Sequence, residues 1–165
     1  MGVTNITKDI DQRALTITAE FAAPVERLWA LYADPRQLER VWGPPTHPAT
    51  FVDHDLNPGG VCRYFMTGPE GERFGGWWKI AEVEAPHRFA FDDGFADAEL
   101  NPVDDLPVSH NVYAFEAVEG GTRATFTTTY DSADALQQVL DMGMEEGATQ
   151  AINQIDAFLA ARVGP

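Results

Sequence analysis

The 165-residue sequence predicts one α+β domain, in which a curved antiparallel sheet of six to seven strands wraps around a long C-terminal helix. Three observations support this prediction. The chain begins with one strand pattern and two short helical patterns. In its middle, apolar residues recur at every second position between hairpin signals, and near its end they recur with the 3.6-residue period of a helix. Hairpins imply antiparallel pairing, and the final helix is the one large element available to cover the apolar face of the sheet.

The first 45 residues predict a strand followed by two short helices. Residues 1–12 are polar, and we expect a flexible tail there, with a single domain over residues 13–163. Apolar and polar residues alternate over residues 14–21, which is typical of a half-buried strand. Pro24 suits the first turn of a helix, and a second short helix follows Asp34-Pro35. The sequence Gly-Pro-Pro then ends the helical segment.

The middle of the chain predicts strands joined by tight turns. "NPGG" at residues 57–60 and "PEGE" at residues 69–72 separate alternating segments, and Glu119-Gly120-Gly121 joins two more. Glycine in such short connections is a hairpin signal. Residues 95–107 are acidic and contain two prolines, which predicts a mobile loop.

The last part of the chain predicts a helix of about 30 residues, with Ser132 or Asp131 as its N-cap. Gly143 lies within this segment, so the helix is expected to break near it, and Gly147 follows four residues later. Each glycine costs about 1 kcal/mol in a helix interior, which indicates a compensating role: close packing on the sheet, a kink or space for a ligand, with close packing favoured. A curved sheet around one helix is the helix-grip architecture, whose concave side usually leaves a cavity.

Composition excludes several function classes. The net charge is −15, which argues against nucleic-acid binding and against attachment to anionic membranes. A single cysteine excludes an internal disulfide, and no apolar segment approaches the length of a membrane span. The N-terminus lacks the apolar core of a signal peptide, so we expect a cytoplasmic protein.

The sequence offers no strong catalytic or cofactor motif, and we predict no catalytic residue, no metal and no cofactor. Gly59-Gly60 lies between two strands, whereas a phosphate loop needs a helix after it. Cys62 is expected to be structural. The histidines lack metal-ligand spacing: His47, His54, His87 and His110. Asp92 and Asp93 are neighbours on a strand, so they point to opposite faces, and we expect a solvated strand end there.

A cavity lined by aromatic side chains is the favoured site. Arg63 indicates that the opposite face of its strand, with Cys62, Tyr64 and Met66, looks inward. The polar group that orients a ligand is left open, because His110 and Asn111 alternate and cannot both face the cavity. The predicted lining residues are Trp42, Phe51, Tyr64, Met66, Trp78, Phe91, His110, Phe115, Phe126, Tyr130, Met144 and Gly147.

Six motifs in order resemble a known family: "FAAPVERLWALYADPRQLERVWGP", "DLNPGG", "GPEG", "EVEAPHRFAF", "GGTRATF" and "GMEEGATQAINQIDAFL". Over residues 14–162 the chain is similar to the family named for the C-terminal domain of the activator of heat-shock protein 90 ATPase, within the START-like (SRPBCC, birch-pollen-allergen-like) superfamily. The resemblance implies a helix-grip fold with a hydrophobic ligand cavity. The chain departs from the pattern at Met144, where the family often has Trp.

Three functions follow as hypotheses. The first is binding of a small hydrophobic or aromatic molecule, such as a lipid, in the cavity. The second is an enzyme of polyketide cyclase or hydrolase type that uses the same cavity, with His110 or Tyr130 as an acid/base residue. The third, implied by the resemblance, is a module that interacts with a chaperone. The sequence leaves both a monomer and a homodimer open.

Overall fold

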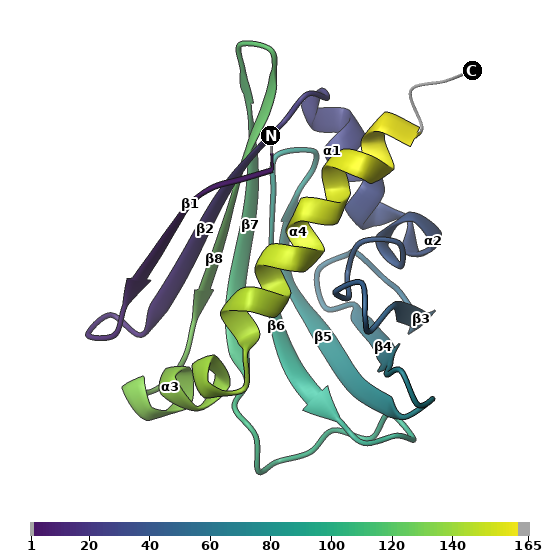
Figure 1. The fold of residues 1–165 in the computed structure, drawn as a ribbon, viewed down its shortest axis with the longest axis vertical. Coiled ribbons are helices and arrows are strands. Elements are labelled where there is room, and N and C mark those ends of the chain that lie inside the picture. Colours follow the sequence, from purple (N-terminus) through teal and green to yellow (C-terminus); the bar gives the residue numbers. More distant parts are fainter. Residues whose placement is uncertain (1, 162–165) are drawn as a thin grey trace.

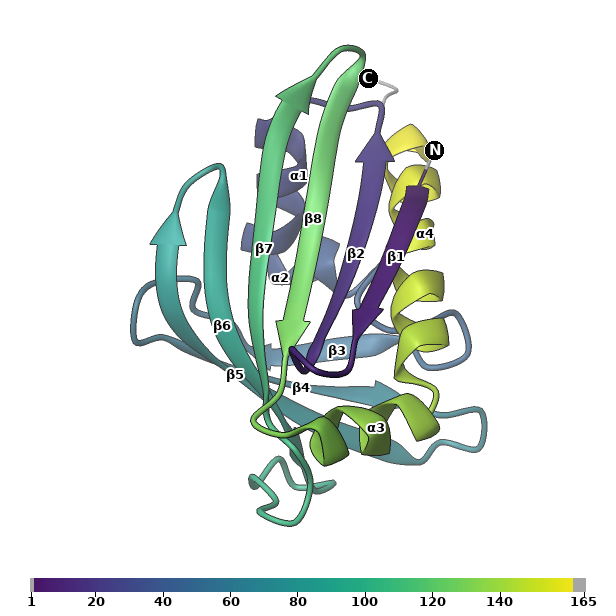
Figure 2. The same cartoon turned by 90° about the vertical axis from the view of Figure 1, so that its left-hand side faces the viewer.

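The computed structural model describes residues 2–161. Eight antiparallel strands form one sheet in the order β1-β2-β8-β7-β6-β5-β4-β3, and the sheet curls around helix α4 (Figures 1 and 2). The elements are β1 Gly2–Asp9, β2 Ala14–Phe21, α1 Val25–Ala33, α2 Pro35–Leu38, β3 Ala49–Asp53, β4 Val61–Thr67, β5 Arg73–Glu84, β6 Arg88–Ala96, β7 Ser109–Val118, β8 Gly121–Thr129, α3 Ala133–Asp141 and α4 Met144–Ala161. The predicted fold class is confirmed, with one strand more than the upper expectation.

The additional strand lies in the segment that the sequence predicts as a tail. Residues 2–9 form β1, which pairs with β2 at the edge of the sheet, so the expectation of a flexible tail is wrong for these residues. Residue 1 of the expected tail and residues 162–163 of the expected domain lie outside the described residues. Two apolar side chains of β1, Val3 and Ile6, pack against the core. The backbone N–H of Val3 also donates a hydrogen bond to Oδ1 of Asn153 on α4, at 2.9 Å. This hydrogen bond joins residues 150 positions apart in the sequence, which a local pattern cannot reveal.

The two short helices close one end of the curved sheet (Figure 1). Leu28, Leu31 and Tyr32 of α1 are buried in the core. Asp34 ends α1 and caps α2, because its side chain accepts a hydrogen bond from the backbone N–H of Arg36 at 2.9 Å. The predicted Asp-Pro break between two helices is therefore confirmed.

The predicted hairpin turns are also present. Gly59, Gly71 and Gly120 have φ angles of 83°, 84° and 85°, a region that glycine adopts without strain. Residues 97–108 form a loop between β6 and β7, in which the side chain of Asp97 accepts a hydrogen bond from the backbone N–H of Asn101 at 2.9 Å. The turns hold the strands of the curved wall in register.

The C-terminal helical segment consists of two helices. Ser132 is the N-cap of α3, and its hydroxyl accepts a hydrogen bond from the backbone N–H of Ala135 at 3.0 Å. Gly143, with a φ angle of 88°, separates α3 from α4, as the sequence predicts. In Figure 1, α3 lies at the lower left, beneath β1, β2 and β8, and α4 crosses the concave face of the sheet. Among residues 2–161, no helix has the length and apolar character that a membrane span needs.

Candidate functional site

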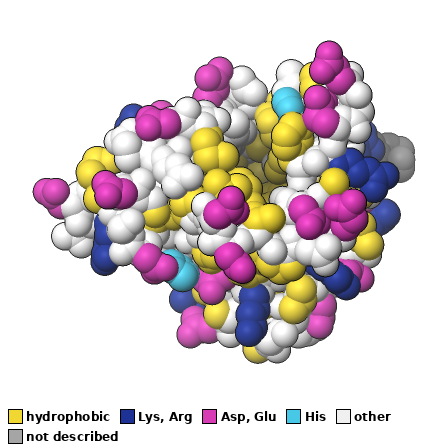
Figure 3. Space-filling view, turned by 90° about the horizontal axis from the view of Figure 1, so that it is seen from below, with side chains coloured by type: hydrophobic (Ala, Val, Ile, Leu, Met, Phe, Trp, Pro, Cys, Tyr) yellow, Lys and Arg dark blue, Asp and Glu magenta, His cyan; other side chains and the backbone are white. Residues whose placement is uncertain are grey.

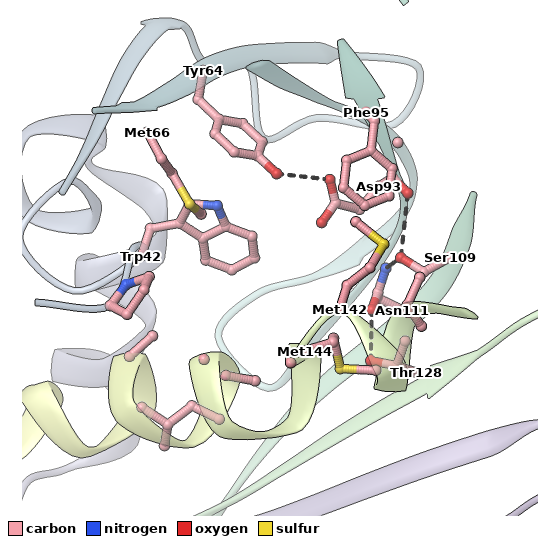
Figure 4. A pocket seen from close by; sticks show the side chains of 18 of the residues that line it. Trp42, Tyr64, Met66, Asp93, Phe95, Ser109, Asn111, Thr128, Met142 and Met144 are labelled. Carbon is pink, nitrogen blue, oxygen red and sulfur yellow. Dashed lines mark hydrogen bonds between the residues drawn. The ribbon is translucent and has the colours of Figure 1, made fainter. Parts of the chain in front are cut away.

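A cavity of about 400 Å³ lies between the concave face of the sheet and the two C-terminal helices. Strands β4, β6, β7 and β8 form one wall, and α4 with the α3–α4 junction forms the other (Figure 4). Aromatic side chains make up much of the surface: Tyr32, Trp42, Tyr64, Phe95, Tyr113 and Tyr130. Met66, Met142 and Met144 add thioether side chains, which adapt readily to differently shaped ligands.

Half of the predicted lining residues lie on this cavity. They are Trp42, Tyr64, Met66, Tyr130, Met144 and Gly147. The inward direction of the Tyr64 and Met66 face of β4 is therefore as predicted from Arg63.

Five predicted lining residues lie in the solid core instead: Phe51, Trp78, Phe91, Phe115 and Phe126. Their side chains point to the concave side of the sheet, but other aromatic rings pack over them and separate them from the cavity. The ring centroids of Trp78 and Phe91 are 4.4 Å apart, and those of Phe51 and Trp78 are 5.5 Å apart. Tyr32 of α1 stacks on Phe115 at 5.6 Å. Helices α1 and α2 thus fill this end of the concave space, and the open cavity occupies the other end.

His110 is the sixth predicted lining residue that the structure places elsewhere. Its ring lies on the outer face of β7, between the carboxylates of Asp92, at 2.7 Å, and Asp131, at 2.9 Å. These two hydrogen bonds raise the pKa of His110 above its ordinary value of 6.5. Because side chains alternate along a strand, Asn111 faces the cavity instead.

Asp93 is the cavity residue that sequence reasoning missed. It lies on β6, faces the cavity and accepts a hydrogen bond on Oδ1 from the Tyr64 hydroxyl at 2.9 Å (Figure 4). Burial raises its pKa from the ordinary value of 3.8 to about 7. The expectation of a solvated strand end was right for Asp92 and wrong for Asp93. The signal was present, because Phe89, Phe91 and Asp93 alternate on one face of the strand.

Tyr64 reaches Asp93 because a glycine lies between them. Gly76 of β5 pairs with Tyr64 in the sheet, and a Cβ atom at Gly76 would collide with the tyrosine ring. The ring therefore lies across β5 and extends toward β6. Burial, followed by the charge of Asp93, raises the pKa of Tyr64 well above 10. The phenol thus keeps its proton at neutral pH and acts as a hydrogen-bond donor to the carboxylate.

A second polar group forms a closed network beside Asp93. Asn111 donates to the Ser109 hydroxyl at 3.0 Å and accepts from the Thr128 hydroxyl at 2.8 Å (Figure 4). Ser109 in turn donates to the backbone carbonyl of Asp93 at 3.3 Å. These bonds fix the orientation of Asn111 and hold β6, β7 and β8 together at the polar end of the cavity.

Gly147 makes room for the cavity on the helix side. A Cβ atom built there meets no atom within 4 Å, so the glycine faces open space. The expectation that Gly147 serves close packing is wrong, and ligand space is the role that the geometry supports. Because α4 continues on both sides of Gly147, larger side chains can extend from this position into the cavity.

The remaining candidates of the sequence do not form a reactive site. Cys62 is buried, and its sulfur accepts a hydrogen bond from the backbone N–H of Asp55 at 3.4 Å. Burial raises the pKa of this thiol to about 11, so it is a poor nucleophile at neutral pH. Within residues 2–161, no group of three or more His, Cys, Asp or Glu side chains is arranged to hold a metal ion.

Comparisons with known proteins give the family and the fold. The model of the family described as activator of Hsp90 ATPase homolog 1-like protein matches residues 22–160. The crystal structure of protein Ms6760 from Mycobacterium smegmatis is 66% identical, covers 95% of this chain and 96% of its own, and has a TM-score of 0.88. A solution structure from Arthrobacter aurescens is 48% identical, covers 98% of this chain and 94% of its own, and has a TM-score of 0.93.

A more distant structure carries the family name itself. The AHSA1 protein from Silicibacter pomeroyi is 25% identical, covers 90% of this chain and 98% of its own, and has a TM-score of 0.73. None of the curated proteins matches the chain. Since the family model spans most of the chain and two structures at 48% and 66% identity cover nearly all of it, the protein belongs to the activator of Hsp90 ATPase homolog 1-like family of the START-like superfamily.

Proposed function

We propose that this protein binds a small, predominantly apolar molecule in the cavity between the sheet and α4. The observation that carries the proposal is the cavity itself, with a volume of about 400 Å³ and walls of aromatic and thioether side chains around a few polar groups. Sites for small molecules typically have volumes of roughly 300–1,000 Å³ and this mixture of surfaces. A helix glycine that faces open space agrees with a cavity maintained for a ligand.

A fluorescent probe tests this proposal directly. N-Phenyl-1-naphthylamine is apolar and uncharged at neutral pH, so the net charge of −15 does not repel it as it would an anionic dye. Gly147→Leu places a side chain in the cavity without removing a packing contact, whereas Gln150→Leu adds the same side chain at an exposed position of α4. We expect saturable probe binding that Gly147→Leu abolishes and Gln150→Leu leaves unchanged. Equal binding by both variants would contradict the proposal.

Catalysis in the same cavity is a second candidate, and Asp93 is the observation that favours it. A carboxyl group with a pKa of about 7 can accept or donate a proton at neutral pH. An enzyme of cyclase or hydrolase type would therefore use Asp93 with Tyr64, not His110, which lies on the outer face of the sheet. If so, Asp93→Asn would abolish turnover of a bound substrate while preserving probe binding, and equal turnover by this variant would exclude the assignment.

A further inference from the structure

We infer that the ligand of this cavity is an organic amine, whose cationic ammonium group pairs with Asp93 while its apolar part contacts the aromatic walls. This inference rests on the proposed function and names the chemical class of the ligand. Its basis is the charge balance of the cavity, the free face of the carboxylate and the distribution of charge around the entrance.

The cavity contains a carboxylate and no basic side chain to balance it. The residues that line it, all within the described part of the chain, include no Lys, Arg or His. The titratable groups that face Asp93 are tyrosines: Tyr64 from β4, Tyr113 from β7 and Tyr130 beyond β8. Helices α3 and α4 contribute only uncharged side chains to the lining. A partly buried carboxylate without a charged partner is costly unless a cation or several hydrogen bonds compensate it, and an ammonium group supplies both.

The geometry leaves one side of the carboxylate open for such a partner. Oδ1 is held by the Tyr64 hydroxyl, while Oδ2 has no hydrogen-bond partner among residues 2–161 and points into the cavity (Figure 4). The rings of Trp42, Tyr64 and Tyr113 lie around the same space. Aromatic faces attract ammonium groups through cation–π interactions, which are strongest where water is excluded. A carboxylate within aromatic walls is thus suited to an alkylammonium or arylalkylammonium ion.

The charge outside the cavity favours the same class of ligand. The loop of residues 97–108 contributes Pro107 to the lining and carries four exposed acidic residues: Asp97, Glu99, Asp104 and Asp105. Figure 3 shows acidic side chains around a hollow lined by hydrophobic side chains at the end of the molecule that carries α3 and this loop. A negative field at an entrance concentrates cations and repels anions. Fatty acids and other carboxylate ligands are therefore disfavoured, although the apolar walls would accommodate their chains.

A matched pair of ligands tests this inference. 1-Naphthylmethylamine is a cation between pH 6 and pH 8, and 1-naphthylmethanol has nearly the same shape without the charge. Calorimetric titration of the full chain measures both dissociation constants at pH 6 and pH 8. Because the carboxyl group has a pKa of about 7, the fraction of ionised Asp93 rises about tenfold between these values. We expect the amine to bind about tenfold more tightly at pH 8 than at pH 6, and the alcohol to show no such gain.

Asp93→Asn completes the test, because it keeps an oxygen that can accept the Tyr64 hydrogen bond but cannot ionise. It should reduce amine affinity to that of the alcohol and remove the pH dependence, whereas Asp11→Asn, in the exposed turn between β1 and β2, should change neither. Equal, pH-independent binding of amine and alcohol would overturn the inference and leave the proposed function intact. Tighter binding at pH 6 would overturn it in favour of a ligand that accepts a proton from Asp93. Binding of neither compound nor the neutral fluorescent probe would contradict the proposed function as well.

Discussion

Asp93→Asn should stabilise the ligand-free protein, by an amount that grows with pH. Burial raises the pKa of Asp93 from 3.8 to about 7, so the folded protein keeps a proton that the unfolded chain has already lost over this interval. Folding stability must therefore fall as the pH rises from about 4 to 7. At 1.36 kcal/mol for each pKa unit, the cost reaches roughly 4 kcal/mol above pH 7, and more than half of it, roughly 2–3 kcal/mol, develops between pH 5 and pH 8.

Urea unfolding of the wild type and the variant at pH 5 and pH 8 measures this effect. The difference in unfolding free energy between Asp93→Asn and the wild type should increase by roughly 2–3 kcal/mol from pH 5 to pH 8. Asp11→Asn, which replaces an exposed carboxylate in a turn, should show the same small difference at both pH values. A constant difference for Asp93→Asn would refute the reasoning, because it would mean that Asp93 ionises in the folded protein as readily as in the unfolded chain.

Three further predictions follow from the same structure. Gly147→Ala should raise the free energy of unfolding by about 1 kcal/mol, because alanine favours the helix and its Cβ meets open space. Gly143→Ala should lower it by about 1–2 kcal/mol, because the φ angle of 88° is strained for alanine. Equal effects of the two substitutions in urea unfolding would contradict these roles. Cys62 should react with a thiol reagent at pH 8 only after denaturation, and rapid modification of the native protein would show that it is accessible. The ring protons of His110 should titrate in NMR spectra with a midpoint above 6.5, so its contribution to stability is lost as the pH rises through that midpoint; a midpoint at or below 6.5 would contradict the bridging geometry.

Local sequence patterns predicted most of the fold, because turns and alternation are local properties. The hairpin glycines, the Asp-Pro break and the interruption at Gly143 each depend on a few neighbouring residues. The strand β1 was missed because it is stabilised by residues far away in the sequence. Val3 and Ile6 pack against the core only because β2 and α4 lie beside β1.

Half of the predicted lining residues were placed correctly, because the direction of a side chain on a strand is a local property and its packing partners are not. Alternation identifies which residues share a face, so Tyr64 and Met66 were placed correctly once Arg63 indicated the outer face. It cannot show whether an inward ring meets open space or another ring, and Trp78 lies in the core because Trp42 and Phe91 cover it. That outcome depends on where α1, α2 and α4 pack against the sheet.

Asp93 shows how an adjacent pair can mislead. Two consecutive carboxylates suggest a solvated strand end, yet alternation places one on each face, and the apolar residues at positions 89 and 91 share the face of Asp93. A charged residue that continues the apolar face of a strand becomes a functional-site candidate when it lies in a cleft and its pKa is perturbed, as for Asp93. The same reasoning separates His110, on the outer face of β7, from Asn111 in the cavity.

Amide chemical shifts of the glycines test the central claim, ligand binding in the cavity, most directly. In ¹H–¹⁵N NMR spectra the glycine amides form a separate region. Gly94, Gly143 and Gly147 line the cavity, while Gly59 and Gly120 lie in hairpin turns outside its lining. Titration with N-phenyl-1-naphthylamine should shift the three cavity glycines saturably, with one common dissociation constant, and leave the two turn glycines unchanged. Shifts confined to the turn glycines, or no shift at saturating probe, would contradict the account.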